Sequence, residues 1–193
     1  MAYKKAPNEE RAILSSTHYS RAGDFSAAAT DLKDWLERSP GSSQARLAQA
    51  GLLQKSQQFK EAEAQYLKVL DVQPNNLIAL NNLAWLLHEQ GDERALGYAE
   101  QAYQLDSSRP ALIDTLGWLL VQNKQSERGI ELLQSAVRHD GNDAEFRYHL
   151  AAAYEQAGRL EEARREIRVA LENRESLSDL EQAQALSRRL GNK

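Results

Sequence analysis

The sequence of 193 residues has no cysteine, only four prolines and only ten glycines. Without cysteine the chain cannot be a disulfide-stabilised scaffold. The scarcity of proline and glycine leaves long stretches without helix breakers, and Ala, Leu, Gln, Glu and Arg, which favour helix, dominate the composition. β-Branched residues, which favour strands, are few. The composition therefore predicts an all-α fold.

An excess of positive charge is also lacking. The chain carries 24 Lys and Arg against 28 Asp and Glu, a formal net charge of −4. The chain therefore lacks the overall positive field that would indicate nucleic acid or an acidic membrane surface as a partner.

Long apolar runs are lacking too. The longest run, around Trp118–Val121, is far shorter than the roughly 20 residues that cross a bilayer. Residues 1–7 contain no apolar stretch typical of a signal peptide. We expect no direct membrane insertion and, for the chain as written, a cytoplasmic location.

Small residues recur at a fixed spacing along most of the chain. They are separated by 34, 33, 34 and 34 residues and are Ala28, Ala62, Ala95, Gly129 and Ala163. A period of this length indicates a repeat architecture. The register predicts an extension (1–8), five repeats (9–42, 43–76, 77–109, 110–143 and 144–177) and a tail (178–193).

Each repeat contains two amphipathic stripes joined by a short turn. In the last repeat the turn is Ala157–Arg159, and apolar residues at helical spacing lie on both sides of it. A second column of small residues lies in the first helix of each repeat: Ser16, Ala50, Ala84, Gly117 and Ala151. Small residues in both helices allow the two axes to cross closely.

On this period and these columns, residues 9–177 resemble the tetratricopeptide repeat (TPR) family. The resemblance implies a right-handed superhelix, an α–α solenoid of five helix–turn–helix repeats. Two repeats depart from it, because Gln57 and Lys124 replace the glycine of the turn. A left-handed conformation at either residue would cost about 1 kcal/mol. Gly129 would weaken its helix by about 0.5–1 kcal/mol, unless a closer approach of the two axes offsets this.

The tail is expected to form a helix that covers the apolar end of the last repeat. Ser178 and Glu181 have the spacing of a capping box, and the tail has an apolar stripe of Leu180, Ala183, Leu186 and Leu190. Residues 1–8 offer no comparable cap. A homo-oligomer formed through the N-terminal end therefore stays open as an alternative.

The resemblance also implies that ligands bind in a concave groove lined by the first helix of each repeat. Distinctive side chains at groove positions occur in the last three repeats. The predicted ligand-groove residues are Asn81, Asn82, Trp85, His88, Asp114, Trp118, Tyr148, His149 and Glu155.

Trp85 and Trp118 occupy the same position in successive repeats, and we expect them to stack as neighbours on the groove wall. They could anchor a peptide or simply pack between adjacent first helices. Asn81 and Asn82 could bind a ligand's main chain with their amides, or bond between helices. Acidic and polar residues in the last repeats would favour a ligand with Lys or Arg, or form a solvated face.

Catalysis and metal binding receive no support. The four histidines, His18, His88, His139 and His149, lie apart in the sequence without a metal-ligand spacing. Only His149 has a predicted acidic neighbour, Asp114, in the adjacent repeat. We expect no enzyme activity, no cofactor and no metal.

A finer resemblance covers residues 76–170. The sequences of residues 81–87, 95–103, 112–122 and 146–154 look like the C-terminal repeats of bacterial TPR proteins of exosortase (PEP-CTERM) exopolysaccharide systems. Those relatives are exported envelope proteins. The chain shows no export signal and no lipidation cysteine, so a periplasmic or envelope location would make it an excised segment of a longer protein.

We therefore expect a non-enzymatic adaptor or scaffold that binds a protein or peptide segment in its concave groove. The finer resemblance implies a role in bacterial envelope or exopolysaccharide assembly. One alternative is a structural scaffold that self-assembles through its uncapped N-terminal repeat. Another is a polysaccharide-binding surface whose tryptophans stack on sugar rings.

Overall fold

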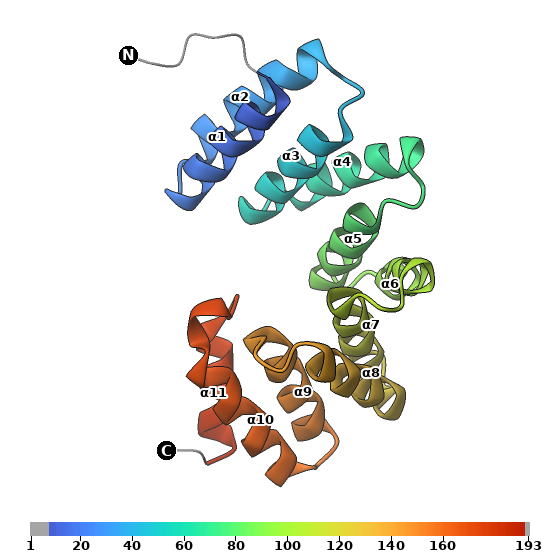
Figure 1. Ribbon diagram of the computed structural model, residues 1–193, viewed down its shortest axis with the longest axis vertical. Coiled ribbons are helices and arrows are strands. Elements are labelled where there is room, and N and C mark those ends of the chain that lie inside the picture. Colours follow the sequence, from blue (N-terminus) through green and yellow to red (C-terminus); the bar gives the residue numbers. More distant parts are fainter. Residues whose placement is uncertain (1–7, 192–193) are drawn as a thin grey trace. The chain divides into compact units, whose positions relative to one another are not determined.

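The computed structural model describes residues 8–191, and within them all secondary structure is helical (Figure 1). The helices are α1 (Glu9–Arg21), α2 (Phe25–Arg38), α3 (Ser43–Lys55), α4 (Phe59–Val72), α5 (Leu77–Glu89), α6 (Arg94–Leu105), α7 (Pro110–Gln122), α8 (Ser126–His139), α9 (Ala144–Gln156), α10 (Leu160–Glu172), the 3-10 turn η1 (Arg174–Ser176) and α11 (Leu180–Arg189). The expected all-α fold of helical hairpins with a C-terminal capping helix is confirmed. Except for Asn8, the predicted N-terminal extension lies outside the described residues.

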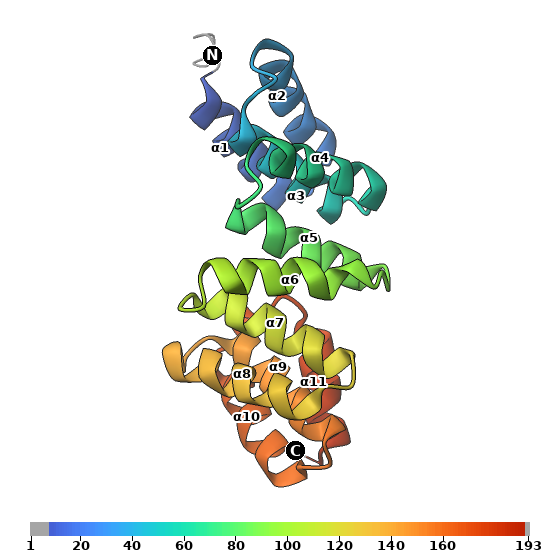
Figure 2. The same cartoon turned by 90° about the vertical axis from the view of Figure 1, so that its right-hand side faces the viewer.

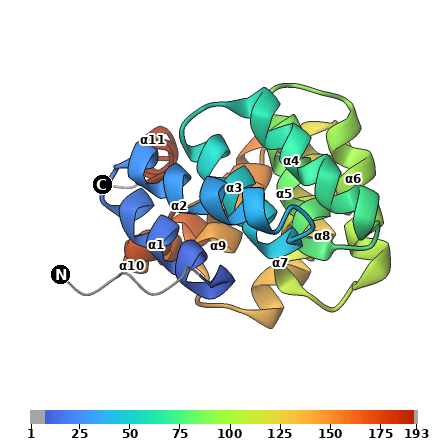
Figure 3. The same ribbon diagram turned by 90° about the horizontal axis from the view of Figure 1, so that it is seen from above.

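The chain divides into two compact units, with the division between Glu93 and Arg94. In the first unit, α1 pairs with α2 and α3 with α4, and α5 packs on α3 and α4 (Figure 3). Side chains cap the N-termini of four helices in this unit: Asn8 caps α1, Asp24 caps α2, Ser42 caps α3 and Asn76 caps α5. Such caps satisfy amide groups that a helix start otherwise leaves without a partner.

The core of the first unit is built from small and branched side chains. Ala12, Ala28, Leu32, Ala45 and Leu52 form one buried cluster, and Trp35 packs against it. Trp35 is thus a core residue of the first two hairpins, as its place in a second helix predicts.

In the second unit, α7 pairs with α8 and α9 with α10, while α6 packs on α7 and α11 on α10 (Figure 2). One buried cluster runs from Leu133 of α8 through Leu150 and Ile167 to Leu186 of α11. The tail therefore extends the core of the last hairpin. Its predicted capping box does not form, because Asp179 caps α11 and Ser178 bonds to Glu145 of α9 instead.

The turns at Gln57 and Lys124 keep the left-handed conformation in spite of its cost. Their φ angles are 60° and 63°, close to the 73° of Gly158 in an equivalent turn. The turn geometry is therefore kept even where glycine is missing.

Helices α7 and α8 cross at a glycine on each side. A Cβ built on Gly129 would lie 2.5 Å from Val121 Cγ2, 2.7 Å from Gly117 O and 3.0 Å from Val121 N. Two of these atoms belong to the backbone and cannot rotate away. Only glycine fits there, so the low helix propensity of Gly129 is offset by a closer approach of the two axes.

We predict that Gly129→Ala lowers the free energy of unfolding of the second unit by about 2–3 kcal/mol, because the added methyl group overpacks the crossing. Gly97 in α6 is the matched control, since no heavy atom lies within 4 Å of a Cβ built there. Gly97→Ala should stabilise by up to about 1 kcal/mol through helix propensity. Urea unfolding followed by circular dichroism measures both, and equal stability of Gly129→Ala and the unsubstituted protein would contradict the steric argument.

Candidate functional site

The structure places the predicted groove residues on three first helices. Asn81, Asn82, Trp85 and His88 lie on α5 in the first unit, whereas Asp114 and Trp118 on α7 and Tyr148, His149 and Glu155 on α9 lie in the second. Each set is described within its own unit. The stacking of Trp85 on Trp118 stays a prediction.

On α5, part of the polar surface is used inside the first unit. Asn82 is hydrogen bonded to the hydroxyl of Tyr66, which is fully buried in α4. Burial is the main reason that the pKa of Tyr66 rises to about 12. Trp85 meets His88 edge to face, with ring centroids 5.9 Å apart. By contrast, Asn81 Oδ1 is buried and accepts no hydrogen bond from the residues that the structure describes.

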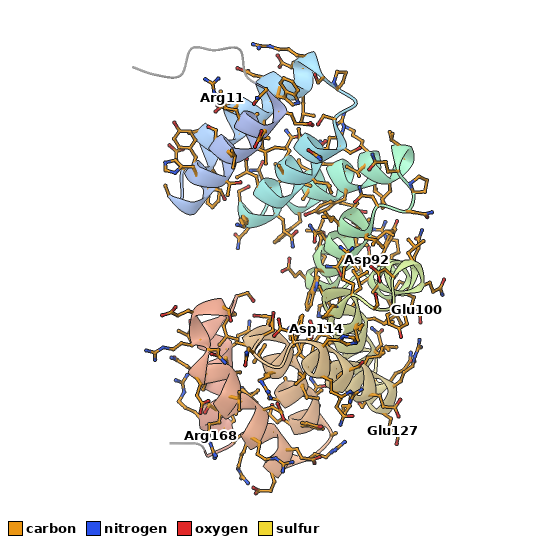
Figure 4. All side chains as sticks on the ribbon, in the orientation of Figure 1. Arg11, Asp92, Glu100, Asp114, Glu127 and Arg168 are labelled. Carbon is orange, nitrogen blue, oxygen red and sulfur yellow. The ribbon has the colours of Figure 1, made fainter. Side chains whose placement is uncertain are left out.

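In the second unit, Asp114, Trp118 and His149 form a compact cluster across α7 and α9. His149 Nδ1 lies 2.8 Å from Oδ2 of Asp114, which is labelled in Figure 4. The imidazole stacks on the indole of Trp118, with centroids 4.8 Å apart and an angle of 24° between the planes. Asp114 is 3% and His149 4% exposed, while Trp118 is half-buried. The predicted proximity of Asp114 and His149 is thus confirmed.

The electrostatics of this pair follow from its burial. Burial alone would lower the pKa of His149. The negative charge of Asp114, its hydrogen bond to the imidazole and the charge of Glu145 act in the opposite direction and outweigh burial. The pKa of His149 is therefore raised above 6.5. Burial raises the pKa of Asp114 despite the opposing charge of His149. Asp114 Oδ1 accepts no hydrogen bond from residues 8–191, which further disfavours the ionised form. Both shifts favour keeping a proton on the pair.

The tail bonds to the groove side of α9, which the sequence did not reveal. Glu145 accepts hydrogen bonds from Ser178 N (2.9 Å) and Oγ (2.8 Å), and Tyr148 donates its hydroxyl to Gln182 Oε1 (3.1 Å). Glu155 forms a two-pronged ion pair with Arg189 at 2.9 and 2.8 Å. The predicted ligand residues Tyr148 and Glu155 are therefore bonded within the unit.

A signal for these contacts exists in the sequence. The bonded residues are 33 or 34 residues apart, the repeat period itself. The tail thus continues the register of the first helices beyond the fifth repeat.

A hollow of about 510 Å³ lies between α8 and the turn from α9 to α10. Its walls include Glu127, labelled in Figure 4, with Ile130, Gln134 and Arg159. Arg159 lies over the ring of Tyr154 and pairs with Glu162. The hollow is an open outer surface with no buried polar group directed into it among its lining residues.

Within residues 8–191, no group of three or more His, Asp and Glu is placed to hold a metal ion. No helix of this part of the chain has the length and hydrophobicity to cross a bilayer.

Two family models described as tetratricopeptide repeat match the chain, one over residues 20–84 and one over residues 115–178. Together they cover more than half of the sequence. None of the curated protein sequences compared with the chain matches it.

Solved structures match the fold over almost the whole chain. PilF of Pseudomonas aeruginosa is 24% identical with a TM-score of 0.76, and the match covers 94% of this chain and 82% of PilF. PilW, a type IV pilus biogenesis factor, is 19% identical with a TM-score of 0.80, covering 96% and 88%. YrrB, a TPR protein with an unusual peptide-binding site, is 16% identical with a TM-score of 0.65, covering 96% and 93%. At these identities the likeness is one of fold.

We predict that His149 titrates above its ordinary pKa of 6.5. Asp114→Asn should lower the midpoint, because it removes the negative charge that most strongly favours the protonated imidazole against the effect of burial. A raised histidine pKa stabilises the folded state fully below about 6.5, and this contribution is lost as pH rises through the folded-state pKa. NMR titration of the imidazole measures the midpoint. A midpoint at or below 6.5 in the unsubstituted protein would contradict this assignment.

Proposed function

The chain belongs to the tetratricopeptide repeat family, and from this premise we propose that it is a non-enzymatic adaptor that binds a protein or peptide segment in its concave groove. Members of this family mediate protein–protein interactions, and the proposal assigns that role to the first helices of this chain. In the first unit the binding residues would be Asn81, Asn82, Trp85 and His88. In the second, Trp118, Tyr148 and Glu155 would contact the partner, and the buried Asp114 and His149 would hold Trp118 in place.

The observation that carries the proposal is the fixed orientation of Trp118. One face of its indole is covered by His149, which Asp114 holds in place, and the residue as a whole keeps part of its surface exposed. Tryptophan is enriched among the residues that dominate binding energy at interfaces. A side chain already held in one rotamer loses little entropy when a partner covers it.

The side chains around Trp118 favour a partner that presents an apolar side chain with a hydrogen-bond donor beside it. Tyr148 is half-buried next to His149, and its hydroxyl reaches Gln182. Glu155 is neutralised by Arg189, so it adds less acidity to the groove than its sequence position predicts. The selectivity for Lys or Arg would therefore be weak, and the apolar anchor would dominate.

We place this adaptor in bacterial envelope assembly. The resemblance of residues 76–170 to repeats of exopolysaccharide systems supports that setting, and so do the folds of PilF and PilW. A periplasmic or envelope location would follow if the chain is a segment of a longer exported protein.

A second candidate function is self-assembly through the first repeat. Leu14 on α1 is 62% exposed, whereas the residues at the same repeat position in the second unit, Thr115, His149 and Ala183, are at most 4% exposed. We infer a contact for a second copy here, because an apolar side chain is exposed at a position that these other repeats bury. Growth in mass with concentration, measured by light scattering after size exclusion and abolished by Leu14→Asp, is expected if this surface joins two copies. A constant monomeric mass would contradict it.

The groove is tested with a phage-displayed library of random linear peptides as the probe. Peptides selected on the protein should bind Trp118→Ala at least tenfold more weakly, a loss of about 1.4 kcal/mol or more. Leu105→Ala is the matched control, because Leu105 is an exposed apolar residue of α6 in the same unit, and it should bind as before.

Fluorescence polarisation gives the affinities, and thermal melts show whether Trp118→Ala stays folded. Trp118→Phe, which keeps an aromatic face for His149, should retain most of the affinity. Undiminished binding to a folded Trp118→Ala would contradict a groove site centred on this residue.

A further inference from the structure

We propose that the Asp114–His149 pair controls how firmly the start of the C-terminal helix is attached to α9, and thereby how much of the groove side of α9 is open to a partner. The proposal concerns regulation of the groove and rests on the proposed function only for its biological use. The physical coupling is a property of the second unit alone.

The coupling runs through Glu145. Its carboxylate lies 3.6 Å from His149 Nε2, one helical turn away on α9, and it accepts the two hydrogen bonds from Ser178. Asp114 therefore holds one side of the imidazole, while Glu145 links the other side to the first residues of the tail. The contacts join α7, α9 and the segment before α11 in one chain of polar groups.

The charge of His149 decides the strength of this link. A protonated imidazole attracts the Glu145 carboxylate and keeps it beside α9, where it can accept from Ser178. A neutral imidazole that donates Nδ1–H to Asp114 turns the lone pair of Nε2 toward Glu145, which weakens the attraction. Loss of the proton therefore loosens the anchor of the tail.

The other charged groups near this site are already paired or act in the same direction. On α9 itself Asp143 adds to the field of Glu145 and favours the proton. From α10, Glu166 pairs with Arg147 of α9, and from α11, Arg189 pairs with Glu155. The contact of α8 with the end of α9 joins Gln134 to Tyr154 and carries no charge at neutral pH.

The far end of α11 is held independently. Leu186 and Leu190 are buried in the core cluster, and Arg164 Nε donates to Leu190 O at 2.6 Å. These contacts do not depend on a histidine. Ala183 is buried in the same cluster, so deprotonation should open residues 178–182 next to Glu145 and Tyr148, without release of the whole helix.

The test measures amide hydrogen exchange of residues 178–182 between pH values of about 5.5 and 9, with protection corrected for intrinsic exchange. Protection should fall as pH rises through the His149 midpoint, by about tenfold for each unit by which opening lowers the His149 pKa. Glu145→Gln, at a partly exposed site, keeps a hydrogen-bond acceptor for Ser178 but loses the negative charge. In this variant, amide protection should no longer change with the protonation of His149.

Asp114→Asn should move the loss of protection to lower pH together with the NMR midpoint of His149. His139→Gln, an exposed histidine on α8, is the matched control and should leave the profile unchanged. Constant protection across a range in which His149 titrates would overturn the proposal. Because no peptide takes part, this outcome is independent of whether peptides bind at Trp118.

Discussion

The structure depends on the close crossing of two helices within a hairpin, as in α1–α2, α3–α4, α7–α8 and α9–α10. At α7 and α8 this crossing allows no side-chain atom at Gly129, since Val121 and the backbone of Gly117 occupy the space. Elsewhere alanine has the same role, and Ala28, Ala62 and Ala163 are fully buried. With the axes this near, larger residues on either side of the crossing, such as Leu116 and Leu133, become buried. The spacing of small residues thus determines which side chains form the core and which remain at the surface for binding.

A buried ionisable pair is an expensive feature in such a core. Apolar residues of similar volume often stabilise a fold as well as or better than a buried ion pair. Asp114 and His149 nevertheless lie between α7 and α9, with one carboxylate oxygen lacking a donor among the described residues. The pair lies beside a half-exposed tryptophan and next to Glu145, which holds Ser178 of the tail. This placement favours a functional role for the pair that offsets its cost in folding stability.

Much of the fold could be predicted from the sequence, because the period and the small-residue columns constrain every hairpin in the same way. The register located the two turns that lack glycine, but it did not decide that Gln57 and Lys124 keep the left-handed conformation. The place of Trp35 in a second helix predicted its packing against the core. Of the site, the contact of Asp114 with His149 could be anticipated from neighbouring repeats. The bonds of Tyr148 and Glu155 to the tail were not predicted, although their spacing equals the repeat period, because the apolar stripe of the tail indicates a cap with its polar side toward solvent. The capping box at Ser178 failed for a related reason, since a local spacing competed with a tertiary partner, Glu145.

The register of the tail has a consequence for how the array can change in length. The bonds of Glu145, Tyr148 and Glu155 to the tail span 33 or 34 residues, so they join equivalent places in successive repeats. Duplication or loss of one whole repeat would keep the helices in phase, whereas a gain or loss of another length would turn them out of phase. After a change of one whole repeat, the tail would meet a hairpin in the same register. It would form the same bonds wherever that hairpin supplies two carboxylate acceptors and one hydroxyl donor at these positions.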